Sequence, residues 1–312
     1  MKGLQEVKKD AIIILNGISL KKKLFYHEYL PAISQIFNVE VHETLSKNDA
    51  KSLASKFTER YVDVILAAGG DGTLHQVLNG ILKGRENESK LPALGVIPIG
   101  SGNDFARGAG LKLSVDHTLQ ILSDFKVRPI DVGLIEFSEL PAVQTEKGTA
   151  YFINVADIGM GPEVVGNVLR SGRPFGSEVA YYKSILNTFL TYKPMVVRAV
   201  TEHWSWEGKL RTLAVANGQY YGHGLCIAPG AIMDDRMFSV FICGNVSVLD
   251  FIMHTGTLKK GKNIVMDEVL YKTTTSIEFS SESPCPIEGD GEVLGWLPAK
   301  VKMMERQMNF LI

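Results

Sequence analysis

The sequence predicts two domains, an α/β domain with a parallel sheet and then an all-β domain. The first third alternates short apolar runs with helical stretches, which is typical of βαβ units. From about residue 130 the chain shows short alternating stretches punctuated by Gly, Pro and Asn, as in a β-sandwich or barrel. A length of 312 residues allows both domains.

The expected elements follow one another regularly along the chain. Apolar runs predict strands at 11–15, 39–43, 62–68 and within 91–100, and helical spacing predicts helices at 22–36, after an Asn48 cap, and at 73–83. One helix, at about 177–192, interrupts the β-rich part. We expect the α/β domain at 1–128 and the β-rich domain at 129–303, with 304–312 packing back onto the first.

Composition and charge exclude several classes of protein. Hydrophobic residues make up 45% and charged residues 21%, an ordinary globular balance, and the net charge of −1 gives no general attraction to nucleic acid. Cys226, Cys243 and Cys285 have no disulfide or zinc spacing, which fits a reducing cytosol.

Membrane association is expected to be peripheral at most. No apolar run is long enough to span a bilayer, and the apolar core at 11–15 is too short for a signal peptide. We therefore expect a cytoplasmic protein; any contact with the inner membrane face would be peripheral and local, with Lys259, Lys260 and Lys262 as candidates. The sequence leaves a homodimer open.

The stretch "AAGGDGTLHQVLNG", residues 67–80, carries the first functional signal. It joins an apolar strand to a helix, with Gly69, Gly70 and Gly72 surrounding Asp71 in the turn. Glycine permits close approach to the backbone, and the unpaired amides that begin a helix attract anions. The turn therefore predicts a phosphate site, although it is neither a Walker loop nor a GxGxxG sequence.

A second turn, "IGSGNDFARG" at residues 99–108, follows the next strand. It again places glycines after a strand, together with Ser101, Asn103 and Asp104. Two such turns from neighbouring strands predict that they face each other across a nucleotide.

The two turns resemble those of the diacylglycerol kinase catalytic domain, which bacterial lipid kinases share with sphingosine and ceramide kinases. Three further stretches resemble the family in the right order: "YFINVADIGMGPEVV" (151–165), "VANGQYYGHGLCIAPGAIMDDRMFSVFI" (215–242) and "IEGDGEVL" (287–294). The resemblance implies a fold of the NAD kinase and diacylglycerol kinase type. This fold has an N-terminal Rossmann-like nucleotide domain, a C-terminal β-sandwich and a cleft between them where ATP and a lipid alcohol meet.

The resemblance also implies site residues. The residues that would contact ATP are Asn16, Thr44, Gly69, Gly70, Asp71, Gly72, Thr73, Leu74, His75, Ser101 and Asn103. Asp71 would act near the Mg²⁺ that accompanies ATP, and Glu292 in "GDGE" would be the general base, with Asp290 as the competing carboxylate. A second, structural Mg²⁺ would be held by the carbonyls of Ile232 and Met237 and the carboxylate of Asp235.

Several positions depart from the family pattern. The first strand ends in "NGISLKK", which keeps Asn16 and lacks the family's proline, and Gln76 stands where Glu is usual. Gly161 stands where Asp is expected, and Arg236 replaces a turn glycine and puts a fixed cation beside the structural Mg²⁺.

The favoured function is an ATP-dependent lipid kinase that converts diacylglycerol into phosphatidic acid. Three alternatives remain open at this stage. The chain could phosphorylate a sphingoid base or another lipid, it could be an NAD kinase, since these enzymes also carry Gly-Gly-Asp-Gly-Thr, or it could be an inactive nucleotide-binding regulator. Retention of Asp71 and Glu292 favours an active enzyme.

Overall fold

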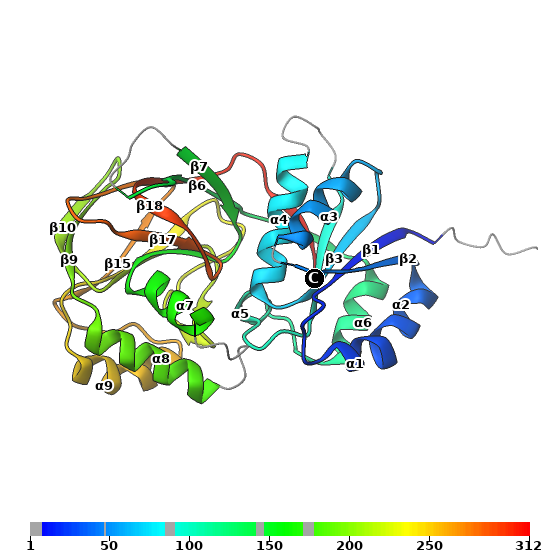
Figure 1. The fold of residues 1–312 in the computed structure, drawn as a ribbon, viewed down its shortest axis with the longest axis horizontal. Helices are drawn as coiled ribbons and strands as arrows, with labels where there is room; N and C mark the ends of the chain where they lie inside the picture. Colours follow the sequence, from blue (N-terminus) through cyan, green and yellow to red (C-terminus); the bar gives the residue numbers. More distant parts are fainter. Residues whose placement is uncertain (1–7, 47, 85–90, 142–146, 171–177) are drawn as a thin grey trace, which may run out of the picture. The chain divides into compact units, whose positions relative to one another are not determined.

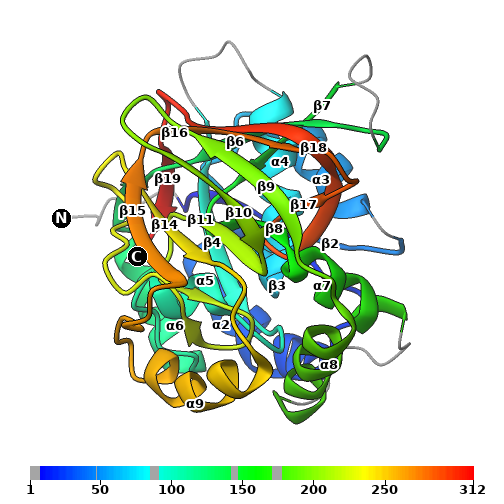
Figure 2. The ribbon, with the colours of Figure 1, turned by 90° about the vertical axis from the view of Figure 1, so that its left-hand side faces the viewer.

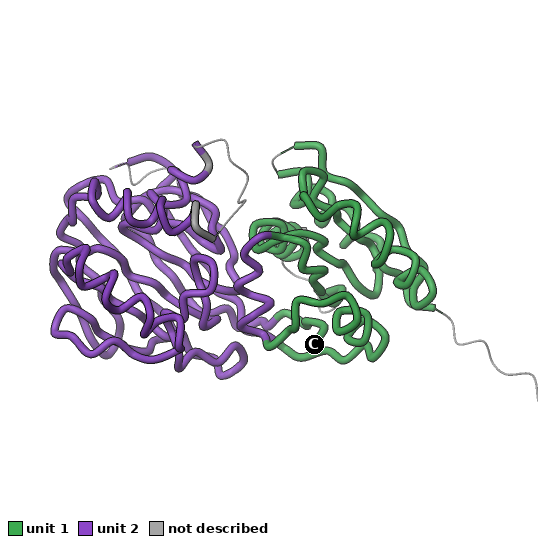
Figure 3. The backbone as a smooth tube through the Cα atoms, turned by 90° about the horizontal axis from the view of Figure 1, so that it is seen from below, with its two compact units in different colours: residues 1–100, 110–129, 308–312 green, residues 101–109, 130–307 purple. Residues whose placement is uncertain are grey.

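The computed structural model describes residues 8–46, 48–84, 91–141, 147–170 and 178–312. The chain forms two compact units (Figure 3). The first comprises residues 1–100, 110–129 and 308–312, and the second comprises residues 101–109 and 130–307.

The first unit is built on a six-stranded sheet with the order β2-β1-β3-β4-β19-β5. The pairs β1–β2, β1–β3, β3–β4 and β4–β19 are parallel. The strands are β1 (Asp10–Leu15), β2 (Asn38–Glu43), β3 (Val64–Gly69), β4 (Ala93–Pro98), β5 (Val127–Ile130) and β19 (Met308–Leu311). The chain terminus thus returns to the first sheet, where Phe310 pairs with Leu94.

Helices connect these strands, as expected for βαβ units (Figure 1). The predicted helix at 22–36 consists of α1 (Lys22–Leu24), a π-helical turn η1 (Phe25–Tyr29) and α2 (Leu30–Ile36). The others are α3 (Asp49–Thr58), α4 (Asp71–Gly84) and α6 (Val115–Asp124). Apolar residues of β1, β3 and β4 pack against η1 and α2 in one core.

The cap predicted for α3 is wrong in its detail. Asn48 occupies the N-cap position in a left-handed conformation, and its side chain makes no capping hydrogen bond. The carboxylate of Asp49 instead accepts hydrogen bonds from the main-chain N–H groups of Leu45 and Ser46, both at 2.7 Å. A carboxylate is the stronger acceptor, and it lies where the helix dipole favours negative charge.

The second unit is built on an eleven-stranded antiparallel sheet that curls into a β-sandwich or half-barrel (Figure 2). Its main path runs β10-β9-β16-β18-β17-β8-β11-β14-β15, and β6 pairs with β18 and β7. The strands are β6 (Gly133–Ser138), β7 (Lys147–Phe152), β8 (Val155–Gly159), β9 (Met195–Val200), β10 (Ser205–Leu210), β11 (Thr212–Ala216), β14 (Phe238–Cys243), β15 (Val269–Thr274), β16 (Ser276–Ser281), β17 (Pro286–Gly289) and β18 (Glu292–Met303). The short strands β12 (Tyr220–Tyr221) and β13 (Leu225–Cys226) form a separate ribbon.

The second unit holds more helices than the sequence predicted. The expected helix at 177–192 is α8 (Glu178–Thr191), and the structure adds α5 (Asp104–Gly108), α7 (Met160–Arg170) and α9 (Val248–Lys259). The sequence of α9, "VLDFIMHTGTLK", is apolar around much of its circumference, so the helical period is hidden.

Two cores stabilise the second unit. One fills the space enclosed by the curled sheet and includes Phe152, Phe238 and Ile287. The other lies where α7, α8 and α9 cover the sheet, and it includes Val164, Phe189 and Phe241. This second core surrounds the pocket described below.

Candidate functional site

The carboxyl ends of four neighbouring strands position the predicted phosphate site of the first unit. After β1, the main-chain N–H of Asn16 donates to Ala68 O at 2.9 Å. After β4, the N–H of Gly100 donates to Gly69 O at 3.0 Å. Ligand sites in parallel sheets form at this edge, because the loops that follow the strands converge there.

Thr44, which follows β2, has a structural partner at this edge. Its Oγ1 accepts a hydrogen bond from the N–H of Gly17 at 3.1 Å. A Cβ at position 17 would lie 2.2 Å from Thr44 O, so the two loops approach each other as only glycine allows. Thr44 therefore fixes the loop that carries Asn16.

The turn between β3 and α4 is tight in the way its glycines predict. The N–H groups of Thr73 and Leu74 both donate to Gly70 O, at 3.0 and 3.1 Å. A Cβ at position 69 would lie 2.2 Å from Thr73 Oγ1, so a larger residue would displace the turn. Gly70, Asp71 and Gly72 are partly exposed at the start of the 14-residue helix α4, where an anion can approach the amides.

Two residues predicted to contact ATP have buried side chains. Leu74 packs into the core, and His75 is buried beside Asn79, whose Nδ2 donates to His75 O at 2.9 Å. Neither side chain is therefore placed to contact a phosphate, and the N–H of Leu74 already donates to Gly70 O. The side-chain chemistry of the turn is therefore concentrated in Asp71.

The second glycine turn leads into the second unit. Asn103 is buried and adopts a left-handed conformation (φ 55°) at the N-cap of α5, whereas Ser101 is exposed. The carboxylate of Asp104 accepts a hydrogen bond from the N–H of His223 at 2.8 Å. These contacts fix the turn to the loop after β12.

The two candidate carboxylates near the end of the chain have different environments. Asp290 is buried and its carboxylate accepts hydrogen bonds from the main-chain N–H groups of Ile153, Asn154 and Val155, at 3.1, 2.9 and 3.1 Å. Its own backbone is left-handed (φ 51°). Glu292 begins β18 and is partly exposed. Asp290 is thus an anchor for the break between β7 and β8, and Glu292 is the more accessible of the two.

A pair of buried carboxyl groups lies next to this turn, and sequence reasoning did not anticipate it. Asp157 on β8 stands opposite Glu288 on β17. Asp157 accepts hydrogen bonds from Thr212 Oγ1 at 2.7 Å and from the Tyr221 hydroxyl at 2.9 Å. Glu288 Oε2 accepts from the N–H of Gly291 at 2.7 Å, which ties the pair to the turn before Glu292.

Burial makes this pair unusual electrostatically. It raises the pKa of Asp157 from 3.8 to about 7. Burial, and then the charge of Asp157, raises the pKa of Glu288 well above its usual range. In the described part of the chain neither carboxyl forms an ion pair, so the pair retains a proton at neutral pH.

Asp157 occupies the space that a side chain at position 161 would need. A Cβ built on Gly161 would lie 1.7 Å from Asp157 Oδ2 and 2.4 Å from the Tyr221 hydroxyl. The sequence resemblance placed an Asp at 161, where this chain has Gly. A carboxyl group is therefore present at this place in the structure, and it comes from position 157.

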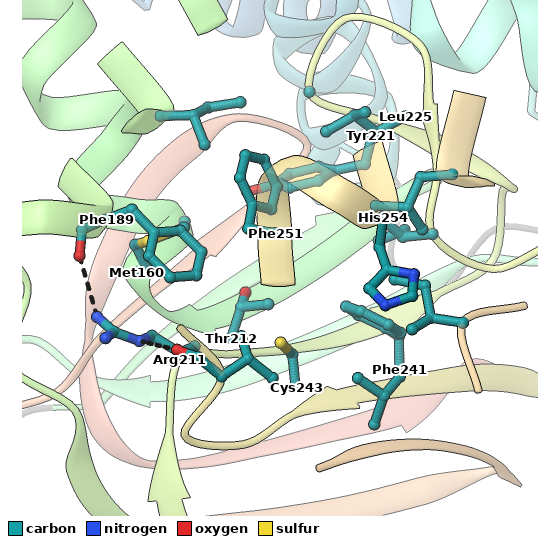
Figure 4. Close-up of a pocket in the computed structure, with 18 of the residues that line it drawn as sticks. Met160, Phe189, Arg211, Thr212, Tyr221, Leu225, Phe241, Cys243, Phe251 and His254 are labelled. Atoms are coloured by element: carbon teal, nitrogen blue, oxygen red, sulfur yellow. Dashed lines mark hydrogen bonds between the residues drawn. The ribbon is translucent and has the colours of Figure 1, made fainter. Parts of the chain in front are cut away.

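An apolar pocket lies beside the same residues, between the sheet and the helices α7, α8 and α9 (Figure 4). Its cavity volume is about 90 Å³, and it is partly open to solvent. Phe189, Phe241, Phe251 and many aliphatic side chains line it. Its polar lining includes Thr212 and Tyr221, the two residues that donate to Asp157.

Arg211 also lines the pocket, but its charge is directed elsewhere. Its guanidinium donates to the carbonyls of Phe189, Tyr192 and Val246, at 3.1, 3.0 and 3.2 Å. The group therefore joins β11 to the end of α8 and the loop before α9. The pocket consequently suits a long apolar chain with a polar group at the end near Tyr221.

The loop expected to hold a structural Mg²⁺ places Arg236 directly beside its carboxylates. It offers two neighbouring carboxylates, Asp234 and Asp235, and one oxygen of Asp235 accepts the N–H of Met237 at 3.0 Å. Arg236 is left-handed (φ 66°), as a glycine would be, and its N–H and guanidinium contact buried Asp131 at 2.6 and 3.4 Å. The loop thus carries its own cation. Among the described residues, no three His, Cys, Asp or Glu side chains form a metal-binding group.

Comparison with known proteins identifies the family. Residues 10–135 match the model of the diacylglycerol kinase catalytic domain, and residues 156–312 match the YegS C-terminal NAD kinase beta sandwich-like domain. The chain belongs to the diacylglycerol kinase family of lipid kinases. Members of this family are phosphotransferases with an alcohol acceptor, so the recognition, fold and enzyme class predicted from the sequence are confirmed.

Individual relatives match most of the length of this lipid kinase. A diacylglycerol kinase of Bacillus subtilis (strain 168) is 26% identical over 310 residues, which cover 97% of this chain and 96% of that protein. A probable lipid kinase YegS-like of Pseudomonas aeruginosa is 29% identical over 254 residues, covering 81% and 78%. The solved structure of a putative diacylglycerol kinase from Bacillus anthracis str. Sterne has the same fold, with a TM-score of 0.77, 20% identity and 97% coverage of both chains.

The lipid kinase has no helix, within its described residues, that is long and apolar enough to cross a bilayer. Sequence reasoning missed Asp157, Tyr221 and Glu288. The available signal was Asp157, an acid four residues before Gly161, where the resemblance had led us to expect one.

Proposed function

We propose that this lipid kinase transfers the γ-phosphoryl group of ATP to the hydroxyl of diacylglycerol and so forms phosphatidic acid. The supporting observation is the apolar pocket, whose polar residues are connected to the turn before Glu292 by a series of hydrogen bonds and one strand pairing. Tyr221 and Thr212 line the pocket and donate to Asp157, which stands opposite Glu288, and Glu288 accepts the N–H of Gly291. A lipid alcohol has the matching chemistry, an apolar body with a hydroxyl at one end.

The reaction needs one proton acceptor and an anion site. The alcohol oxygen forms a bond to the γ-phosphorus while the bond between that phosphorus and the ADP oxygen breaks. Glu292 accepts the hydroxyl proton, because it is the accessible carboxylate of the turn and Asp290 is occupied by three main-chain N–H groups. Asp290 and Glu288 hold the turn that presents Glu292.

We assign the binding of the nucleotide to the first unit. The loops of Asn16 and Thr44 and the turn Gly69–His75 would contact ATP, together with Ser101 and Asn103 of the second glycine turn. Asp71 offers a hard oxygen ligand beside the phosphate turn, so it fits the Mg²⁺ that accompanies ATP. When bound, this ion neutralises phosphate charge.

The domain roles follow the same division. Residues 1–128, with 304–312, would bind ATP, and residues 129–303 would bind the lipid. Because the acceptor resides in a membrane, we also propose that the protein is cytoplasmic and reaches the inner membrane face peripherally.

Turnover with defined acceptors tests the proposal. The protein is incubated with Mg·ATP and diacylglycerol, sphingosine or NAD, and products are identified by mass. We expect phosphatidic acid as the main product. A phosphorylated sphingoid base as the main product would mean that the acceptor is a sphingoid base and not diacylglycerol. NADP as the only product would contradict the proposal.

Two variants test the roles of the carboxylates. Glu292→Gln removes the base and keeps the shape, so it should lower turnover by roughly 10²–10⁴-fold while ATP still binds. Asp290→Asn should mainly lower the free energy of unfolding, by about 1–3 kcal/mol, because it weakens the anchor of Ile153–Val155. A larger turnover loss in correctly folded Asp290→Asn than in Glu292→Gln would show that the base is assigned to the wrong residue.

A further inference from the structure

Helix α9 has apolar side chains on two opposite faces. Its inner face places Phe251, His254 and Leu258 in the lining of the pocket, and Phe251 stacks on Phe189 of α8 with ring centroids 5.1 Å apart. Its outer face carries Leu249, Ile252 and Met253, at spacing i, i+3 and i+4. A helix that is apolar on both sides normally has a partner on each side.

The outer residues are bare in the structure. Leu249, Ile252 and Met253 are 71%, 52% and 67% exposed, and Val265, just after the helix, is 92% exposed. Single exposed apolar residues are ordinary, but three adjacent ones on one helical face form a patch that marks a contact surface. We call Leu249, Ile252 and Met253 the α9 patch.

Lysines follow the α9 patch at the end of the helix, and the exposed acids Asp267 and Glu268 come after them. Lys259, Lys260 and Lys262 follow at the end of the helix and are exposed, and Lys259 lies over the Tyr182 ring at 4.5 Å. The acid within the helix, Asp250, is engaged as the cap, where its carboxylate accepts from the N–H and hydroxyl of Ser247 at 2.9 and 2.7 Å. Apolar side chains next to lysines complement the acyl boundary and anionic headgroups of a membrane.

We propose that the α9 patch docks on an anionic lipid bilayer and brings the pocket behind α9 to the membrane surface. The inference rests on the proposed function, since a kinase for a bilayer lipid must reach its acceptor at that surface. The same helix would then have lipid on both faces, with the bilayer outside and the acceptor's acyl chain inside.

Vesicle flotation of the full chain tests the surface. The probes are vesicles of phosphatidylcholine alone and vesicles of an equal mixture of phosphatidylcholine and phosphatidylglycerol. The test variant is Leu249→Ser/Ile252→Ser/Met253→Ser. The control variant is Leu113→Ser/Val127→Thr/Val196→Thr, whose three positions are 47%, 47% and 48% exposed and lie outside α9.

We expect the wild type to prefer the anionic vesicles and the test variant to bind them at least about tenfold more weakly, because apolar burial in the interface is lost. The control variant should bind like the wild type. Changing Lys259, Lys260 and Lys262 to Ala should weaken binding about fivefold per lysine and reduce its salt dependence. Equal binding by wild type and test variant would overturn the inference.

Turnover measurements distinguish a failure of the membrane inference from a failure of the proposed function. With a short-chain diacylglycerol kept below its critical micelle concentration, the test variant should retain wild-type turnover, and with vesicle-borne diacylglycerol it should lose it. If the wild type phosphorylates no lipid but needs the α9 patch for vesicles, the surface stands and the proposed function fails. If the test variant instead converts a dimer to a monomer and keeps vesicle binding, the patch is a contact between two copies of this chain, and the membrane inference fails.

Discussion

Replacing Asp157 with asparagine should change how stability depends on pH. Burial raises the pKa of Asp157 from 3.8 to about 7 in the folded protein. Between these values the folded state holds a proton that the unfolded state has released, so the free energy of unfolding falls as pH rises. Above about pH 7 both states are ionised and this loss is complete.

The size of the effect follows from the two values. One pH unit corresponds to about 1.4 kcal/mol for one proton, so the interval from 3.8 to about 7 corresponds to about 4 kcal/mol in total. About half of this, about 2 kcal/mol, falls between about pH 5.5 and about pH 8.5. The amide introduced by Asp157→Asn cannot ionise, and it can still accept from Thr212 and hydrogen-bond with Tyr221.

Urea unfolding of wild type and Asp157→Asn, at about pH 5.5 and about pH 8.5, measures the difference. The variant should gain about 2 kcal/mol relative to the wild type on going to the higher pH. Asp267→Asn makes the same chemical change at an exposed acid of the same unit and should show no such gain. Parallel pH profiles for wild type and Asp157→Asn would refute the reasoning.

Three further substitutions test other parts of the structure. Gly161→Asp should cost about 3 kcal/mol of unfolding free energy, because its side chain would overlap the carboxylate of Asp157. Adding Asp157→Gly should restore at least about 1 kcal/mol in a double-mutant cycle, and strict additivity would contradict the overlap of the two side chains. Gly69→Ala should weaken ATP binding about tenfold, or about 1.4 kcal/mol, because the added Cβ would overlap Thr73. Gly230→Ala is the control and should leave ATP binding unchanged, because the space around Gly230 is open. Arg236→Gln should cost about 3 kcal/mol by leaving buried Asp131 without its cation, and neither Mg²⁺ nor EDTA should shift the wild-type melting temperature if the loop needs no ion.

The features that the sequence predicted well are local ones. The strand–turn–helix at 64–84 is visible because its apolar periods and turn glycines are contiguous. The family resemblance likewise rests on contiguous stretches. These signals were enough to predict the parallel sheet and the β-rich second part. They were also enough to predict the tight glycine turn between β3 and α4.

The features that sequence reasoning missed depend on strand pairing between distant segments. Asp157 and Glu288 are far apart in the chain and meet only because β8 pairs with β17 in a register that places them opposite each other. Helix α9 was missed for another reason, since apolar residues on its outer face remove the contrast on which helical periodicity depends. The inner face of α9 lines the pocket, and Asp157 accepts hydrogen bonds from two residues that line it, Thr212 and Tyr221.

Product formation from ATP and diacylglycerol is the most direct test of the account. Purified protein is supplied with Mg·ATP carrying ¹⁸O in the γ-phosphoryl group and with diacylglycerol in anionic vesicles, and the lipid product is identified by mass spectrometry. The account predicts phosphatidic acid that carries the label, formed by wild type and lost in Glu292→Gln. Label in NADP or in free phosphate alone, with diacylglycerol unchanged, would contradict it.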